Sequence, residues 1–476
     1  MGEKRQKIQY ELAFKAKGRG EAPEVAEEGV EAPTANRKTE STASTEHLME
    51  EVCERKNLKR ALKRVKANKG SPGVDGMTVE ELPGYLREHW AEVKEQLLEG
   101  AYEPQPVKRV EIPKPGGGVR KLGVPTVLDR FVQQSALQVL QKQWDPTFSE
   151  HSYGFRPGRS AHQAVVQAQK HIAEDHRYVV DIDLEKFFDR VNHDMLMGRV
   201  AKRVTDKRML RLIRAFLNAG VMENGLVGPT DEGTPQGGPL SPLLSNLVLD
   251  DLDRELERRG HRFVRYADDC NIYVRSMRAG ERVMESITRF IEKKLKLKVN
   301  KSKSAVARPR ERKFLGFSFT SNREPRRRIA PKALKRFKKR VRELTRRTRG
   351  VSIEKMVTQL SRYLKGWLGY FAICETPVVL ERLESWIRRR LRCVVWKQWK
   401  RGRTRFAELR RRGVRKGLAA RTAGSAHGPY RLSNSPALTI ALPNGYFRSL
   451  GLPKLEIREI AQPFRTAVYG PVCSVV

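Results

Sequence analysis

Two β-like runs enclose a pair of adjacent acids, and this pattern restricts the fold more than any other feature of the sequence. The runs cover residues 263–266 and 271–274, and Asp268 and Asp269 lie between them. Neighbouring side chains of a strand point to opposite faces, so a turn is needed to bring both carboxylates near one site. Two adjacent carboxylates also repel each other, which is costly without a cation. An Asp-Asp pair alone is more often a solvated turn.

A third acid, Asp183, ends another run that is typical of a buried strand, residues 177–183. If the two strands lie side by side in one sheet, Asp183 and Asp268 can share a pair of divalent cations. Two such ions about 3.5–4 Å apart serve in-line phosphoryl displacement. Carboxylate and backbone carbonyl oxygens suit magnesium. The pattern therefore predicts a two-magnesium site for phosphoryl transfer.

The charge of the chain points to a polyanionic partner. Lys and Arg number 95 against 55 Asp and Glu, a net charge of +40. A nucleic-acid backbone is the commonest polyanion that neutralises such an excess. The alternatives are a basic protein of the ribosomal type and a protein that binds membrane surfaces. Hydrophobic residues make up 39% of the chain, which is enough for a sizeable core.

The apolar runs and the cysteine spacing of the sequence favour an intracellular protein. No apolar run approaches the roughly 20 residues that span a bilayer, and the start has no secretory apolar core. The five cysteines are scattered without a CxxC pair, which disfavours a zinc site and a disulfide framework. We expect a cytoplasmic protein of prokaryotic type that associates with nucleic acid and not with membranes.

The chain changes character along its length. Residues 1–45 are poor in large apolar residues and are expected to form a flexible tail. Helical spacing covers residues 48–65 and stops at 68–70, and Thr78 with Glu81 has the spacing of a capping box at the start of the next helix. Residues 107–124 predict a hairpin around a Gly-rich loop, and residues 128–142 predict a helix. The middle of the chain is therefore mixed α and β.

After Pro331 nearly all signals are helical and strongly basic. Clusters such as 338–340, 388–390 and 410–412 consist of Lys and Arg, while apolar residues recur at helical spacing over 360–371. A single charge run is usually a solvated helix face. So many in one helical segment favour contact with nucleic acid.

At this point the chain resembles a known family. Tyr266-Ala267-Asp268-Asp269 is the form of the palm motif found in group II intron-encoded reverse transcriptases, and residues 183–189 resemble the first palm motif of that family. The resemblance covers about residues 60–410. It implies that Asp183, Asp268 and Asp269 are catalytic and, with the carbonyl of Leu184, hold two Mg²⁺ ions, for which Mn²⁺ is a substitute. Asp181 and Asp189 are expected to be structural or solvated acids.

The resemblance also implies how the incoming nucleotide is held. Lys114 and Arg120 flank the Gly-rich turn that would fold over the triphosphate. Phe188 has the spacing of the aromatic gate that disfavours a ribose 2′-hydroxyl, and core packing is the alternative for it or for Phe187. Gln236, in the motif 233–239, would contact the nucleotide. A gate implies deoxynucleotides and hence DNA synthesis.

Template and primer contacts follow in the same way. Arg156 and Arg159 are candidate contacts to template phosphates, and Tyr266 is a candidate contact beside the catalytic acids. Leu315 and Gly316 belong to a segment that resembles the primer grip, where a tight Gly turn lets the backbone approach the primer. His151 and His193 are expected to be structural.

The basic helical part resembles the maturase-specific domain, which is the thumb of these enzymes, at residues 363–371, 386–392 and 396–400. Many relatives carry a C-terminal endonuclease with paired cysteines and histidines. Beyond Arg401 this chain has only Cys473 and His427, so we expect the form that lacks this domain.

The resulting prediction is an α/β (α+β) right-hand fingers and palm at residues 46–325, an all-α thumb/maturase domain at 330–410, and a basic extension at 411–476 for DNA binding or docking. The expected function is RNA-directed DNA synthesis with deoxynucleotides on intron RNA from a DNA primer or target, together with splicing and retrohoming as a maturase. One alternative is an RNA-binding splicing factor with a vestigial polymerase. Another is a reverse transcriptase of a retron, diversity-generating or CRISPR system. The oligomeric state is left open.

Overall fold

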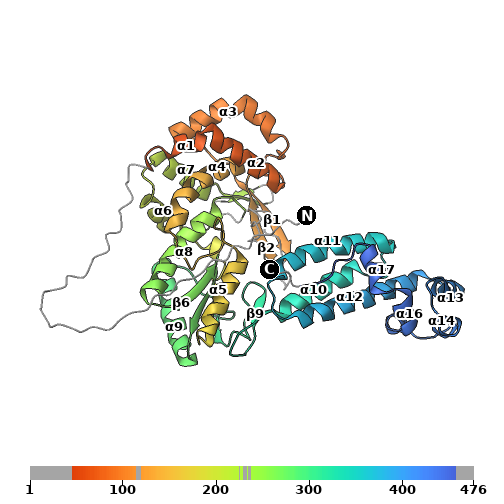
Figure 1. Ribbon diagram of the computed structural model, residues 1–476. Helices are drawn as coiled ribbons and strands as arrows, with labels where there is room; N and C mark the ends of the chain where they lie inside the picture. The colour runs from red at the N-terminus through yellow and green to blue at the C-terminus, as the bar shows by residue number, and fades with distance from the viewer. Residues whose placement is uncertain (1–44, 114–118, 224–225, 229–232, 234–236, 457–476) are drawn as a thin grey trace, which may run out of the picture. The chain divides into compact units, whose positions relative to one another are not determined.

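The computed structural model describes residues 45–113, 119–223, 226–228, 233 and 237–456 (Figure 1). The chain divides into the units Met1–Thr42 and Ala43–Val476, and all described residues belong to the second. Lys114 and Gln236 therefore lie outside the described residues, as does the predicted tail.

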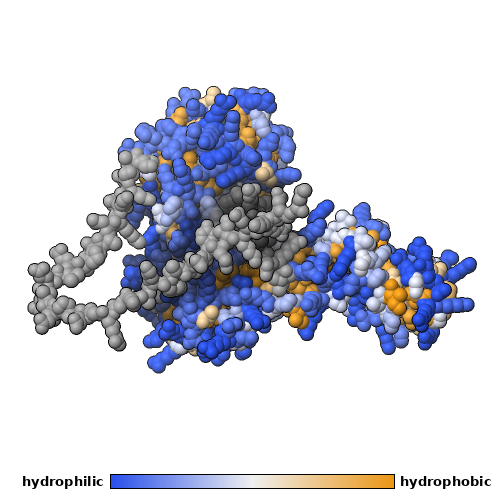
Figure 2. Space-filling view, in the orientation of Figure 1, coloured by the Kyte–Doolittle hydropathy of each residue, from blue (hydrophilic) through white to orange (hydrophobic). Residues whose placement is uncertain are grey.

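Four helices form the N-terminal part: α1 (Leu48–Cys53), α2 (Arg55–Asn68), α3 (Leu82–Glu99) and α4 (Val127–Trp144). The helix expected over 48–65 is two helices, because Glu54 is extended, with φ −61° and ψ 132°. The helix expected to start near Thr78 begins at Leu82, since the Glu81 carboxylate accepts hydrogen bonds from the Thr78 N–H and hydroxyl and these residues form the turn before it. In Figure 2 hydrophilic residues cover most of the visible surface over α1–α3.

The predicted hairpin over 107–124 is confirmed. Strand β1 (Val107–Pro113) pairs antiparallel with β2 (Val119–Val124), from Lys108 opposite Val124 to Pro113 opposite Val119. The other edge of β1 pairs in parallel with β4 (Val221–Glu223), which pairs with β5 (Leu226–Gly228). Helices α6 (His193–Ala201) and α7 (Lys207–Asn218) precede β4.

The central sheet has the strand order β6-β7-β3-β8. Its strands are β3 (Tyr178–Ile182), β6 (Arg262–Tyr266), β7 (Asp269–Val274) and β8 (Ala305–Ala307), all paired antiparallel. It is contacted by α5 (Ala161–Ala173), α8 (Ser241–Arg258) and α9 (Met277–Phe290) (Figure 1). Alternate residues face two hydrophobic clusters: Val180 and Ile182 belong to one, while Val179 belongs to the other.

The second cluster continues into the helical C-terminal part, which follows the short hairpin of β9 (Phe317–Phe319) and β10 (Arg327–Ile329). This part begins with α10 (Pro331–Leu344), α11 (Ile353–Phe371) and α12 (Pro377–Gln398). It continues with α13 (Gly402–Arg411), α14 (Lys416–Ala423), α15 (Pro429–Leu432), α16 (Pro436–Ala441) and α17 (Asn444–Ser449). Residues on both sides of 411, such as Leu409 and Val414, share that cluster.

Two further sequence expectations concern cysteines and membranes. The four cysteines of the described ranges, Cys53, Cys270, Cys374 and Cys393, are buried and free of disulfides. None of the helices in the described part of the chain is long and apolar enough to cross a bilayer.

Candidate functional site

The register of the central sheet brings the predicted acids into one row. Ile182 is paired with Cys270, so the next antiparallel pair is Asp183 with Asp269, and Asp269 is itself paired with Tyr266. Directly opposed residues share a face of the sheet. Tyr266, Asp269 and Asp183 therefore cross one face at the same end of three neighbouring strands, and Asp268 lies in the turn beside them. The site is the end of a sheet face and not a turn alone, because Asp269 is the first residue of β7.

The turn between β6 and β7 consists of Ala267 and Asp268. Ala267 has φ +56°, which is unfavourable for a residue with a side chain. Gly154 lies against this turn so closely that a Cβ there would overlap the backbone nitrogen of Ala267. The strained turn and the tight contact below it fix the backbone that carries Asp268 and Asp269.

A buried ion pair supports this turn from the opposite face of the sheet. Arg265 and Asp253 of α8 both have fully buried side chains, and their hydrogen bonds are 2.6 and 2.7 Å long. The Arg265 guanidinium also donates to the carbonyl of Ala267 (2.9 Å) and to Asn246 (3.0 Å), whose amide donates to the carbonyl of Gly154 (2.9 Å). Hydrogen bonds thereby link helix α8 both to the turn that carries Asp268 and to the loop that packs on this turn.

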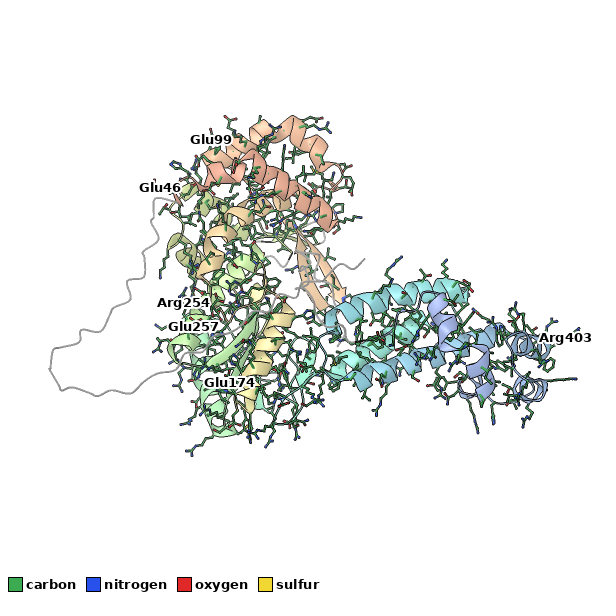
Figure 3. All side chains as sticks on the ribbon, in the orientation of Figure 1. Glu46, Glu99, Glu174, Arg254, Glu257 and Arg403 are labelled. Carbon is green, nitrogen blue, oxygen red and sulfur yellow. The ribbon has the colours of Figure 1, made fainter. Side chains whose placement is uncertain are left out.

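The same helix is anchored further along. Glu257 accepts a hydrogen bond from the Ser149 hydroxyl (2.6 Å), and Arg254 donates to the carbonyl of Thr147 (2.8 Å). Arg254 and Glu257 are labelled in Figure 3. Several hydrogen bonds thus hold the loop that contains Gly154 to α8. This loop in turn supports the turn that carries Asp268.

Asp183 is positioned by a segment 120 residues further along the chain. Its backbone N–H donates to the Ser304 hydroxyl (3.0 Å), and its carboxylate accepts from the Lys303 ammonium (3.4 Å). The neighbouring Asp181 is held by Arg312, which donates to one carboxylate oxygen at 2.9 and 2.6 Å. Asp181 therefore is the structural acid that the sequence predicts.

The carbonyl of Leu184 takes no part in the pairing of Leu184 with Val299. Leu184 forms an antiparallel bridge with Val299, and the two hydrogen bonds around it run from the Asn300 N–H to the Asp183 carbonyl and from the Glu185 N–H to the Lys298 carbonyl. In this type of pair the N–H and C=O groups of Leu184 itself point away from Val299. They point towards the side on which β7 and its acids lie.

The carboxylates of the site lie close enough together to repel one another. The pKa of Asp269 is raised to about 7, because surrounding protein desolvates the carboxyl and because Asp268 and Asp181 lie close to it. Asp269 nevertheless has an exposed surface, so an ion can reach it. Oxygen donors with excess charge fit a divalent cation. Within the described ranges, no group of three His, Cys, Asp or Glu side chains is close enough together to hold a metal. One carboxylate oxygen of Asp183 is in contact with Lys303.

Phe187 and Phe188 differ in burial. Phe187 is buried in the core at 3% exposure, whereas Phe188 is half-buried. The two rings meet edge to face with their centroids 5.2 Å apart, so the buried ring supports the half-buried one. A Cβ at Gly233 would lie 2.9 Å from the Phe188 carbonyl, which shows how closely the first glycine of the 233–239 motif packs on this segment.

Of the remaining nucleotide candidates, Arg120 lies on β2 opposite Ile112.

Arg156 is placed differently from the sequence prediction. Its guanidinium is buried, pairs with the Asp145 carboxylate at 2.9 Å and donates to the carbonyls of Ser149 and Ser152. These bonds make Arg156 a structural residue that holds the loop before Gly154, so the expected contact with a template phosphate is corrected. Arg159 is also engaged, by Glu150 at 2.6 Å, but it is only partly buried.

The expected tight turn at Leu315 and Gly316 is present. Both residues have positive φ, +49° and +80°, and Phe314 and Phe317 exchange backbone hydrogen bonds across them. The Tyr370 hydroxyl of α11 donates to the Leu315 carbonyl at 2.8 Å. The turn is thus fixed to the helical part, and Tyr370 packs against the same hydrophobic cluster as Tyr266.

Sequence reasoning missed Arg265, Asp253 and Lys303. One signal was available for Arg265: a charged residue stands inside an otherwise apolar strand, where an unpaired charge is very costly. No local pattern identifies Asp253 as its partner or places Lys303 against Asp183, because both contacts depend on the tertiary fold.

Comparison with protein families gives two matches. Residues 112–319 match the reverse transcriptase (RNA-dependent DNA polymerase) family, and residues 334–413 match the group II intron maturase-specific domain. The first match contains the whole central sheet. The second begins within α10 and ends just after α13.

Individual relatives agree with these matches. Protein YkfC of Escherichia coli is 31% identical over 325 residues, covering 60% of this chain and 84% of the relative. Group II intron-encoded protein LtrA of Lactococcus lactis subsp. cremoris is 28% identical over 329 residues, so that this chain spans about half (55%) of LtrA. Among solved structures, a chain of the partial Cas6-RT-Cas1–Cas2 complex shares 25% identity over 52% of this chain and 42% of its own length, with a TM-score of 0.34.

Proposed function

The chain belongs to the group II intron reverse transcriptase and maturase family, whose members are RNA-directed DNA polymerases, and on this premise we propose that it copies intron RNA into DNA with two Mg²⁺ ions held by Asp183, Leu184, Asp268 and Asp269. The supporting observation is the row of Tyr266, Asp269 and Asp183 across the ends of three strands. Several carboxylates brought together at the end of one sheet suit metal-assisted phosphoryl transfer.

Each residue of the site has a distinct task in this proposal. Asp183, Asp268 and Asp269 supply carboxylate oxygens, and Leu184 supplies a backbone oxygen that points to the same side. When bound, Mg²⁺ lowers the pKa of the primer 3′-hydroxyl and stabilises the leaving pyrophosphate. Lys303 contacts one carboxylate oxygen of Asp183 at 3.4 Å, and a metal bound by that oxygen would displace the lysine. Lys114, Arg120 and Gln236 contact the nucleotide, and Leu315 and Gly316 contact the primer.

Magnesium is expected to stabilise the protein more at about pH 8 than at about pH 5.5. The folded state holds a proton on Asp269 up to a pKa of about 7, whereas the unfolded carboxyl loses it near pH 4. The folded state therefore binds more protons in this window, so without metal its stability falls as pH rises. Mg²⁺ requires the ionised carboxylate. Thermal unfolding with and without Mg²⁺ at both pH values measures the difference, and Asp269→Asn should abolish it. An equal rise in Tm at both values would contradict this assignment.

Phe188→Ala is expected to relax the choice of sugar. Loss of the ring opens space at the 2′ position, so the kcat/KM ratio of deoxynucleotide to ribonucleotide should fall by about tenfold or more. Primer extension with each nucleotide class measures the ratio. The matched control is Phe187→Leu, which changes the buried ring and should lower stability while it leaves the ratio largely unchanged. A ratio that responds to Phe187 and not to Phe188 would reverse the assignment.

The maturase role involves the second part of the chain. We assign fingers and palm to residues 46–325, the thumb and maturase domain to 330–410 and a docking extension to 411–476. The basic helices would bind the intron RNA, promote its splicing and position a DNA target for retrohoming. RNA recognition of this kind relies on Lys and Arg contacts to the backbone.

One experiment separates the two activities. The intron RNA that flanks the coding sequence is incubated with the protein, and splicing and primer extension are measured in parallel. Both are expected. Splicing without any extension would favour an RNA-binding splicing factor with a vestigial polymerase, and extension without splicing would favour a reverse transcriptase of another genetic element.

A further inference from the structure

A small cavity lined by arginines lies in the helical C-terminal part, away from the catalytic face. Arg342, Arg346, Arg347 and Arg390 line it together with Thr345 and Cys393, and its volume is about 240 Å³. It is formed where α10 ends, against α12 and α15. The volume is below the roughly 300–1,000 Å³ of sites for drug-sized ligands. Among the described residues, the lining includes no carboxylate.

Several of these guanidinium groups are held in place before any ligand arrives. The Nε of Arg390 donates to the Thr345 hydroxyl at 2.7 Å. Arg342 and Arg390 both lie against the ring of Trp386, at 5.7 and 5.5 Å from its centroid. Arginine side chains that are already ordered lose little entropy on binding, so they are suited to hold a small anion.

Among the described residues, no ion pair joins an acid to the four arginines that line the cavity. The closest acid in sequence, Glu343, pairs with Arg340 at 2.9 Å. The pKa of Arg390 is lowered by burial and by the positive charge of Arg342 and Arg347. A capping role at the end of α10 accounts for Arg390, but not for Arg346 and Arg347, whose side chains are exposed. Four cations around one small cavity repel one another, and an anion bound between them would offset that repulsion.

The geometry points to a phosphate as that anion, because the planar guanidinium matches phosphate oxygens with paired hydrogen bonds. The phosphates of a regular duplex lie in rows along a surface, whereas a cavity of about 240 Å³ admits a single phosphate that protrudes where a strand bends. Folded RNA provides such bends at bulges and loops. We propose that this cavity binds one backbone phosphate of a bent RNA strand. The assignment to RNA rests on the proposed maturase function.

The test compares two double variants that remove equal charge. Arg346→Gln with Arg347→Gln alters the cavity. Arg403→Gln with Arg415→Gln alters exposed arginines that do not line it; Arg403 is labelled in Figure 3. Affinity is measured over a series of salt concentrations for an RNA hairpin with a bulge and for an unbulged RNA duplex of equal length. Inorganic phosphate is titrated alone as a third probe.

For the bulged hairpin, the cavity variant should lose about 0.7–1 from the slope of log affinity against log salt, the amount expected for one phosphate contact. The control variant and the unbulged duplex should show a smaller change. Equal slopes for the two variants, or equal losses with both RNAs, would overturn the proposal. Saturable binding of inorganic phosphate that depends on Arg346 and Arg347, without a change in slope for RNA, would overturn it in favour of a free anion.

This outcome is distinguishable from failure of the proposed function. The hairpin probe needs no intron, so a protein that never promotes splicing could still show the slope difference. Thermal unfolding of the cavity variant is measured beside that of the parent protein, and an unchanged Tm confirms that the variant is folded.

Discussion

Replacing Arg265 by Met is expected to destabilise the protein by about 3–5 kcal/mol, because it leaves Asp253 as a buried, unpaired charge. Both side chains are fully buried. The substitution also removes the donor to the Ala267 carbonyl, so the turn that carries Asp268 can shift. A displacement of about 1 Å at a catalytic site can cost about 100-fold in rate. Denaturant unfolding measures the stability, and primer extension by the folded fraction measures the rate.

The double variant Arg265→Met with Asp253→Leu separates these two effects. Replacing both charges by apolar groups is often close to neutral for stability, so most of the lost stability should return. The rate should stay low, since the Ala267 carbonyl still lacks its donor. Full recovery of the rate in the double variant would show that Arg265 acts through stability alone and does not position the turn.

Asp268→Asn is expected to lower DNA synthesis by at least about 10²–10³-fold, with little change in stability or RNA affinity. The substitution removes a charged oxygen ligand at the place where charge develops during the reaction. Its carboxylate also adds to the electrostatic repulsion at Asp269, so the pKa of Asp269 should move down towards its ordinary value. Single-nucleotide incorporation measures the rate.

The matched control is Asp189→Asn, which changes an exposed acid in the 183–189 segment. It removes the same charge without touching the row of Tyr266, Asp269 and Asp183, so it should retain synthesis. If the two variants have the same activity, the assignment of Asp268 to the metal site is wrong.

Much of the active-site region could be predicted because its signals are local. Runs of β-branched and aromatic residues predicted β3, β6 and β7, and the Gly-rich segment between two short strands predicted the hairpin of β1 and β2. The positive φ of Gly316 was expected for the same reason, since a tight turn favours glycine.

What could not be predicted depends on partners that are distant in the chain. Arg156 has the charge of a phosphate contact, but Asp145 and two carbonyls bind it inside the protein. Lys303 meets Asp183 only because β8 pairs with β3. The break between α1 and α2 depends on the backbone of one residue, Glu54, within a pattern that is otherwise helical. Charge and periodicity do not contain this information.

The most direct test of the polymerase site is incorporation of deoxynucleotides by the purified chain on an RNA template with a DNA primer and Mg²⁺. A two-metal site predicts template-directed extension that stops when a chelator removes the metal and that prefers deoxynucleotides to ribonucleotides. Absence of extension under these conditions, or extension that continues in the presence of the chelator, would contradict a two-metal polymerase site at Asp183, Asp268 and Asp269.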